Sequence, residues 1–211
     1  GIKISYIEQA KPKGLPDAFI LGEKFIGKDK VALILGDNFF YGQSLTKTLK
    51  RSTNIKNGAK IFLHPVKNPN LYGVASIDGK NKVSKLVEKP KKTISNLAVT
   101  GLYFFDNKVV NYSKELKPSK RKELEIIDLL NRYKKKRCLK AELIGRGATW
   151  LDTGNINDYY NASNFISTVE NRQGLKIACI EEISLKNNWI SKSDIKKSIK
   201  FYGNCEYSKY L

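Results

Sequence analysis

Short apolar runs bounded by turn residues predict several β-strands in the first half of the chain. The clearest is Val31-Ala-Leu-Ile-Leu35, which ends in Gly36-Asp37-Asn38. A continuous apolar run of this length is typical of a strand buried on both faces. Four further segments rich in aliphatic and aromatic residues predict strands: 59–66, 71–77, 83–87 and 97–105. Turn residues Asp78-Gly79 favour a hairpin between the second and third of these.

Helical spacing of apolar residues predicts four helices that alternate with the strands: 43–51, 108–116, 123–137 and 155–172. The last ends two residues before Gly174, where a C-cap glycine belongs. This alternation indicates an α/β fold with a mixed, mostly parallel sheet. From Leu175 onward the pattern changes to short helical pieces. We therefore expect a main domain at 1–174 and a C-terminal helical extension at 175–211.

The composition favours a soluble globular protein, with 41% hydrophobic residues and no apolar run of the roughly 18 to 20 residues that a membrane helix needs. No short apolar segment follows a basic start, as it would in a secretory signal. Cys138, Cys179 and Cys205 are far apart and odd in number, which argues against a disulfide framework. We expect a cytoplasmic protein.

Basic residues outnumber acidic ones by 39 to 20, a net charge of +19. Such a charge suits nucleic acid, an anionic membrane or phosphorylated small molecules. The lysines are spread along the chain, however, and the densest run, Lys134 to Arg137, ends a predicted helix that opens with Glu123 and Glu125. A solvated helix end explains this run without a partner. We expect small-molecule substrates and neither nucleic acid nor membrane as partner.

The candidate chemistry lies in two carboxylates. His64 is the only histidine, and with three scattered cysteines it forms no zinc motif or catalytic triad. Asp37 follows a predicted strand, at the sheet edge where α/β proteins bind ligands, and Asp152 lies in Trp150-Leu-Asp-Thr-Gly154. Two converging carboxylates repel unless a cation such as Mg²⁺ joins them. Asp37 as a turn residue and Asp152 as a helix cap explain the same pattern equally well.

Eight motifs match one known family in order and spacing, from Gly1 to about Trp189: Gly14-Leu-Pro-Asp-Ala-Phe19, Leu35-Gly-Asp-Asn-Phe-Phe-Tyr-Gly42, Tyr72-Gly-Val74, Val87-Glu-Lys-Pro90, Ala98-Val-Thr-Gly-Leu-Tyr-Phe104, Glu123-Leu-Glu-Ile126, Trp150-Leu-Asp-Thr-Gly154 and Arg172-Gln-Gly-Leu-Lys176. Together they resemble the glucose-1-phosphate thymidylyltransferases, sugar nucleotidyltransferases with a Rossmann-like fold. The resemblance implies Mg²⁺-dependent transfer of a thymidylyl group from dTTP to glucose 1-phosphate, which gives dTDP-glucose and pyrophosphate on the way to dTDP-deoxysugars such as dTDP-rhamnose.

The resemblance also assigns residues to roles. Asp37 and Asp152 match the metal-binding aspartates, and Arg121 joins them among the catalytic residues as a cation facing the sugar phosphate. The substrate-binding residues that it implies are Gln9 and Gly14 for the nucleotide, Asn38, and Tyr72, Gly73, Glu88, Lys89 and Val99 for the sugar phosphate. From the residues alone, Glu88-Lys89 is better explained as an exposed charge pair at a strand end and Tyr72 as ordinary core.

Some features depart from this family. Its Gly-Gly-x-Gly-Thr-Arg-Leu segment, which cradles the triphosphate, has no counterpart here, and the chain starts at Gly1 without any methionine. We expect a piece that lacks this N-terminal segment and is inactive alone. Lys122 replaces a usual glycine, Ile127 a usual threonine and Ile156 a usual histidine.

The family implies a homo-oligomer, a dimer or tetramer. Other readings are a UTP-, CTP- or ATP-dependent transferase, a non-catalytic sugar-nucleotide-binding homologue and a basic nucleic-acid binder.

Overall fold

The computed structural model describes residues 2–79 and 81–211. These residues form two compact units, Ser5–Gly154 and Asn155–Leu211, the latter with residues 2–4. The boundary expected at Gly174 lies inside the second unit, because helix α6 (Ile156–Gln173) groups with the helices that follow it. A functional nucleotidyltransferase domain at 1–174 stays a prediction.

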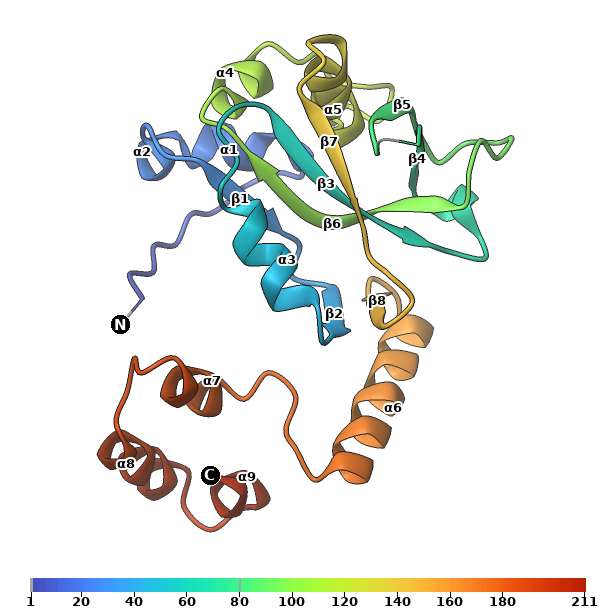
Figure 1. Ribbon diagram of the computed structural model, residues 1–211. Helices are drawn as coiled ribbons and strands as arrows, with labels where there is room; N and C mark the ends of the chain where they lie inside the picture. The colour runs from blue at the N-terminus through green and yellow to red at the C-terminus, as the bar shows by residue number, and fades with distance from the viewer. Residues whose placement is uncertain (1, 80) are drawn as a thin grey trace. The chain divides into compact units, whose positions relative to one another are not determined.

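A six-stranded sheet forms the centre of the first unit (Figure 1). Its strands are β1 (Val31–Ile34), β3 (Ala59–Pro65), β4 (Gly73–Ile77), β5 (Val83–Glu88), β6 (Leu97–Phe105) and β7 (Leu139–Leu143). The order is β5-β4-β6-β3-β7, and β1 pairs with the second half of β6. This confirms the α/β class and the mixed sheet.

The expectation of a mostly parallel sheet holds for strand direction but not for pairing. β1, β3, β4 and β7 run one way, whereas β5 and β6 run the other. β6 runs opposite to its three neighbours, β1, β3 and β4, so all three of its pairings are antiparallel. Among the described pairs in this sheet, β3 with β7 alone is parallel.

Apolar side chains cover both faces of the sheet. On β3, Ile61 and Leu63 belong to one core cluster, and Phe62 between them belongs to the other, as the two-residue period of a strand requires. The first cluster includes residues of α1 (Asp17–Leu21), α2 (Glu23–Ile26), α4 (Val109–Lys114) and α5 (Ile126–Lys135). On the opposite face, Leu49 of α3 (Leu45–Ser52) packs against the second cluster.

Most elements confirm the sequence predictions, including the hairpin of β4 and β5 and the C-cap of α6 at Gly174, which is left-handed. The burial predicted for Val31 to Leu35 is wrong. In β1 the side chains alternate, and Ile34 is 60% exposed. β1 pairs only with β6 among the described strands, so it is an edge strand, and the face that carries Ala32 and Ile34 is open to solvent.

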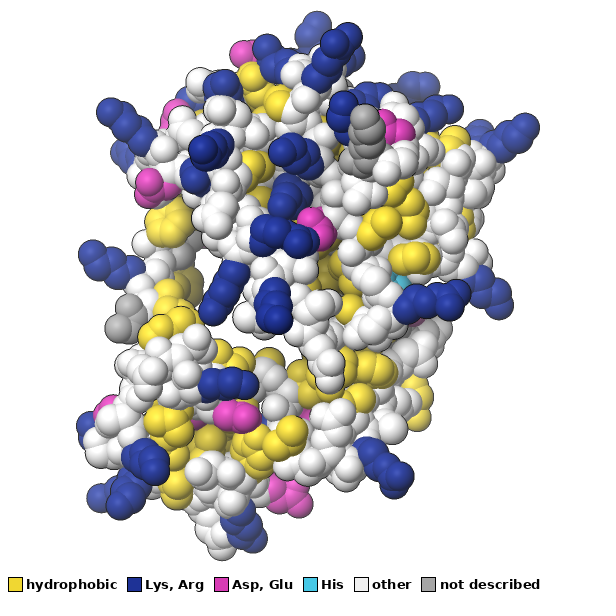
Figure 2. Space-filling view, viewed as in Figure 1, with side chains coloured by type: hydrophobic (Ala, Val, Ile, Leu, Met, Phe, Trp, Pro, Cys, Tyr) yellow, Lys and Arg dark blue, Asp and Glu magenta, His cyan; other side chains and the backbone are white. Residues whose placement is uncertain are grey.

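Charged side chains follow the predicted distribution. Lysine and arginine are scattered over the visible face of the molecule, and acidic side chains lie among them (Figure 2). Basic residues occupy the last turn of α5, where they complement the helix dipole. Within the described residues, no helix is long and apolar enough to cross a membrane.

In the second unit, a buried carboxylate joins α7 (Ile180–Lys186), α8 (Lys192–Tyr202) and α9 (Glu206–Tyr210). Glu181 is only 7% exposed and accepts hydrogen bonds from Tyr202 on α8, at 2.9 Å, and from Tyr207 on α9, at 2.6 Å. Burial alone would raise the pKa of the Glu181 carboxyl, but the hydrogen bonds from Tyr207 and Tyr202 lower it overall. The ionised carboxylate therefore stabilises this group of helices.

We predict that Glu181→Gln lowers the free energy of unfolding of these helices by about 1–2 kcal/mol near pH 7, because a neutral acceptor replaces a charged one. Since the pKa of Glu181 is lowered on folding, the wild type loses this advantage as the pH falls through that pKa. Hydrogen exchange of amides in α7 to α9 measures the effect.

Glu182→Gln is the matched control, because Glu182 is exposed and accepts a single hydrogen bond, from Tyr210. Its effect should be smaller, because the exposed side chain keeps its contact with water. Equal protection of these helices in the wild type and Glu181→Gln at pH 7 would contradict the prediction.

Candidate functional site

The two candidate metal ligands meet at one end of a two-stranded antiparallel sheet formed by β2 (Asn38–Gly42) and β8 (Ala148–Asp152). Its register places Asn38 opposite Asp152, so Asp37 lies directly beside that pair. Thr153 fastens the junction, since its backbone N–H and its hydroxyl donate to the Asp37 carbonyl oxygen at 2.8 and 2.9 Å.

Gly154 marks the point on which both carboxylates converge. A Cβ added at Gly154 would lie 3.1 Å from Asp152 Oδ1 and 3.5 Å from Asp37 Oδ2. The Gly154 N–H also donates to Asp152 Oδ1 at 3.0 Å. Two carboxylates this close repel each other unless a cation lies between them. Sequence reasoning expected this convergence, and the structure brings the pair together.

A divalent cation that keeps several waters fits this donor set. Mg²⁺ typically takes one or two carboxylates and completes its shell with water and substrate phosphates. Within residues 2–79 and 81–211 there is no cluster of three or more histidine, cysteine or acidic side chains that could hold a metal. The pair Asp37 and Asp152 suits Mg²⁺ better than a metal that needs a full protein cage.

The side-chain amide of Asn38 connects this pair to the central sheet. Its Oδ1 accepts the backbone N–H of Gly101 on β6, at 2.8 Å, and the indole N–H of Trp150, at 2.6 Å. Its Nδ2 donates to Asp37 Oδ1 at 2.8 Å. Sequence reasoning placed Asn38 among the substrate-binding residues and gave Trp150 no role. The signal available was spacing, because Trp150 lies two residues before Asp152 and thus on the same face of β8.

A cavity of about 220 Å³ opens beside Asp152; Asp37, the other member of the carboxylate pair, does not line it. Seven of the residues singled out from the sequence line it: Asn38, Tyr72, Gly73, Glu88, Lys89, Val99 and Asp152. The rest of its wall includes Trp150, whose ring meets that of Tyr72 edge-on, with centroids 5.2 Å apart. The structure therefore gathers residues from 38 to 152 around one hollow.

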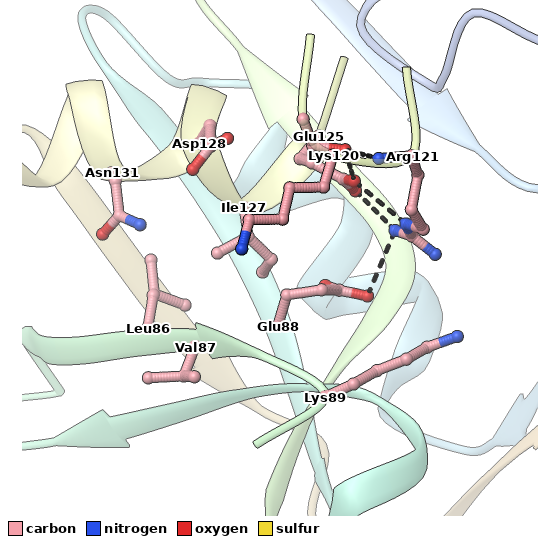
Figure 3. Close-up of a pocket in the computed structure, with 11 residues that line it drawn as sticks. Leu86, Val87, Glu88, Lys89, Lys120, Arg121, Glu125, Ile127, Asp128 and Asn131 are labelled. Atoms are coloured by element: carbon pink, nitrogen blue, oxygen red, sulfur yellow. Dashed lines mark hydrogen bonds and ion pairs between the residues drawn. The ribbon is translucent and has the colours of Figure 1, made fainter. Parts of the chain in front are cut away.

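A second cavity, of about 570 Å³, lies between β5, α5 and the loop before α5 (Figure 3). Glu88 and Lys89 line both cavities, so the two adjoin along these side chains. Arg121 points toward Glu125, to which its Nε and Nη2 donate at 3.1 and 2.7 Å, and its Nη2 lies 4.0 Å from Glu88 Oε1 (Figure 3). Arg121 thus lies in this cavity's wall, not in that of the smaller one.

The charges around Glu88 alter its titration. Burial raises the pKa of the Glu88 carboxyl, and the nearby negative charge of Glu125 raises it further, while Lys89 and Arg121 oppose the shift. Burial would raise the pKa of Glu125 as well, but its hydrogen bonds from Arg121 and Ser119 lower it overall. The proton affinity of Glu88 is therefore set in part by what Arg121 is bound to.

Two lysines near the cavity have left-handed backbone. Lys89, at the end of β5, has φ +38°, and Lys122, in the loop that carries Arg121, has φ +62°. A residue with a Cβ is strained by about 1–2 kcal/mol in this region, whereas glycine is not. Lys122 therefore occupies a backbone conformation that favours glycine, the residue expected there from the resemblance.

The predicted nucleotide contacts, Gln9 and Gly14, lie together but line neither cavity. Gln9 Nε2 donates to Asp17 Oδ2 at 2.8 Å and to the Gly14 carbonyl at 3.4 Å. Gly14 has φ +94°, and a Cβ there would come within 2.1 Å of the Leu124 carbonyl oxygen. Gly14 therefore has a packing reason to be glycine, and its contact with a nucleotide stays a prediction.

Comparison with known proteins identifies the family. The model of the nucleotidyl transferase family matches residues 1–169. The chain belongs to the nucleotidyl transferase family. Within this family, a glucose-1-phosphate thymidylyltransferase of Neisseria meningitidis serogroup A is 46% identical over 211 residues, all of this chain and 73% of that protein. The enzyme of the same name from Mycolicibacterium smegmatis is 42% identical over the same span.

Solved nucleotidyl transferases share the fold. A Bacillus anthracis chain described as a glucose-1-phosphate thymidylyltransferase, in complex with sucrose, is 40% identical with a TM-score of 0.69, over 76% of this chain and 64% of that one. A UDP-glucose pyrophosphorylase complexed with UDP-glucose is 27% identical, also with a TM-score of 0.69, over 78% and 66%. The present nucleotidyl transferase chain thus spans just under two thirds of these solved chains.

We predict that Glu125→Gln lowers the pKa of Glu88. The substitution removes the negative charge that raises this pKa, and it frees Arg121 to approach Glu88 more closely than 4.0 Å. ¹³C NMR titration of the glutamate carboxyls measures it directly. Glu115→Gln, which removes a carboxylate paired with Arg132 elsewhere, is the control and should leave the Glu88 titration unchanged. An unchanged or raised pKa of Glu88 in Glu125→Gln would refute the coupling.

Proposed function

We propose that this nucleotidyl transferase moves a thymidylyl group from dTTP to glucose 1-phosphate, giving dTDP-glucose and pyrophosphate. The observation that carries the proposal is the convergence of Asp37 and Asp152 beside a cavity lined by Tyr72, Glu88 and Lys89. It is supported by relatives at 41–46% identity that are named glucose-1-phosphate thymidylyltransferases.

The reaction needs positioning more than acid–base chemistry. A phosphate oxygen of glucose 1-phosphate attacks the α-phosphorus of dTTP, and the bond from that phosphorus to the bridging oxygen breaks, so pyrophosphate leaves with the electron pair. The attacking oxygen is already ionised near neutral pH, so no side chain has to remove a proton. The scarcity of histidine is therefore no obstacle to this chemistry.

The site residues fit the two halves of this task. Asp37 and Asp152 would hold Mg²⁺, which when bound neutralises charge on the phosphates. Glu88, which lines both cavities, would accept hydrogen bonds from sugar hydroxyls. Lys89 and Arg121 would face the sugar phosphate, the first as a point charge and the second as a fork. Glu125 holds one edge of the Arg121 guanidinium, which leaves its remaining N–H groups for an anion.

In this proposal, Gln9 and Gly14 would contact the nucleotide and select its pyrimidine base. A glutamine amide can satisfy the donor and acceptor edge of a pyrimidine, and glycine allows close backbone approach. A uridylyltransferase is the second candidate, because a UDP-glucose pyrophosphorylase shares the fold at 27% identity.

We further propose a cytoplasmic homo-oligomer, a dimer or tetramer, that supplies dTDP-deoxysugar synthesis. Exposed apolar residues of the second unit, such as Ile180 and Trp189, support subunit contacts.

An assay of pyrophosphate release tests the proposal in the full-length protein, with glucose 1-phosphate and each of dTTP, UTP, CTP and ATP. We expect the highest kcat/KM with dTTP and, because a single methyl group and the ribose hydroxyl distinguish the pair, a weaker activity with UTP. A preference for UTP would favour the second candidate. No release with any nucleotide would overturn the proposed reaction.

We predict that Asp37→Asn and Asp152→Asn each lower kcat by at least about 100-fold, since even changes outside the ligand shell of a metal often cost about 10–100-fold. Each variant should keep the circular dichroism spectrum of the wild type, because neither side chain is part of the core. Near-normal rates for both variants at saturating Mg²⁺ would disprove the metal assignment.

A further inference from the structure

We propose that Trp150 is a positioning residue for the metal site, acting through Asn38 on Asp37. This inference rests on the proposed function. The indole N–H of Trp150 fixes the amide of Asn38, and that amide holds one oxygen of the Asp37 carboxylate. The other oxygen is then kept on the side where Asp152 converges.

The orientation of the Asn38 amide follows from its partners. Its Oδ1 receives two N–H groups, the backbone N–H of Gly101 at 2.8 Å and the indole N–H of Trp150 at 2.6 Å. Both groups are donors only, so a flipped amide would set its NH₂ against two donors. With Oδ1 held there, Nδ2 necessarily faces Asp37, and it donates to Asp37 Oδ1 at 2.8 Å.

Both donors are themselves fixed. Trp150 is 7% exposed, its ring meets Tyr72 edge-on, and it pairs with Phe40 across the two-stranded sheet. Gly101 lies in the middle of β6, and a Cβ there would be 2.5 Å from Asn38 Oδ1. The backbone of β6 thus approaches the amide as closely as only a glycine allows, which ties Asn38 to the most buried strand of the sheet.

The two oxygens of Asp37 consequently have different surroundings. Oδ1 is bound to the Asn38 amide, whereas Oδ2 lies on the Gly154 side, 3.5 Å from the point where a Cβ of Gly154 would be. Asp152 Oδ1 is 3.1 Å from the same point. Without the indole N–H, one of the two anchors of the amide is lost, and the carboxylate of Asp37 can rotate away from the metal position. Such outer-shell contacts orient the ligands of a metal.

Trp150→Phe tests the proposal, because it keeps an aromatic ring against Tyr72 and removes only the donor. The probe is Mn²⁺ alone, whose binding to the full-length protein is followed by water-proton relaxation without nucleotide or turnover. We expect the Kd for Mn²⁺ to rise about tenfold. In the assay, the Mg²⁺ concentration for half-maximal rate should rise similarly, while the KM for glucose 1-phosphate changes less than twofold.

The controls separate the possible failures. Trp189→Phe, at an indole that is 68% exposed in the second unit, should bind Mn²⁺ like the wild type. Asp37→Asn should abolish the binding. If Trp150→Phe binds Mn²⁺ as tightly as the wild type while Asp37→Asn does not bind, the positioning role is wrong and the proposed function stands. If Asp37→Asn also binds like the wild type, the metal site and the proposed mechanism both fail.

A second variant covers the case in which Trp150→Phe does not fold. Gly101→Ala pushes a methyl group into Asn38 Oδ1 and displaces the same amide without changing Trp150. Because the clash is with the end of a side chain, the strand can persist while the amide moves. Weaker Mn²⁺ binding in Gly101→Ala, with a melting temperature within a few degrees of the wild type, supports the same chain of contacts. Unchanged Mn²⁺ binding overturns it.

Discussion

The antiparallel pairing of β2 with β8 brings Asp37 beside Asp152, two residues far apart in the sequence, and the rest of the site is arranged around that pairing. The register leaves one carboxylate at the start of β2 and the other at the end of β8. Asp37 lies one residue before β2, so the strand period does not set the direction of its side chain. The pairing brings the two residues close, and the contacts of Asp37 with Thr153 and Asn38 hold its position.

Electrostatics divides the remaining side chains between two tasks. In the proposed mechanism the carboxylates of Asp37 and Asp152 would hold a cation, whereas Lys89 and Arg121 would face an anion. Glu88 lies between these regions, where burial and the charge of Glu125 favour its protonated form and the two cations favour ionisation. The net charge of +19 gives a positive background field that attracts phosphorylated molecules. The charged side chains that line the cavities set the local direction of that field.

Sequence patterns were sufficient for the elements whose side chains repeat regularly. The strands β3 and β6 and the helix α6 carry dense apolar periods or clear caps, and each forms within two residues of its predicted bounds. β2 and β7 were not predicted: the aromatic run of β2 has no two-residue period, and the alternation of β7, Leu139-Lys-Ala-Glu-Leu143, covers only five residues just after a basic run. The exposure of Ile34 was also missed, since a pattern cannot tell whether one or both faces of a strand are covered.

The site was predictable to the extent that its motifs stand at strand ends. Those motifs bring together Tyr72, Glu88 and Asp152, as expected. The positions of Arg121, paired with Glu125 in the wall of the second cavity, and of Trp150, bound to Asn38, depend on contacts between residues distant in the chain. Such contacts leave no local period, so composition and spacing could not reveal them.

The left-handed backbone of Lys89 and of Lys122 has a consequence for how the rim of the second cavity opens. Each residue holds about 1–2 kcal/mol of conformational strain in the closed arrangement. That strain is released when either segment unfolds locally, so the rim is easier to open than relaxed loops of the same length. No residue of the buried strands β4 and β6 has a positive φ, so these strands carry no such conformational strain. The segments at Lys89 and Lys122 are therefore places where local opening costs less free energy than in the sheet beneath them.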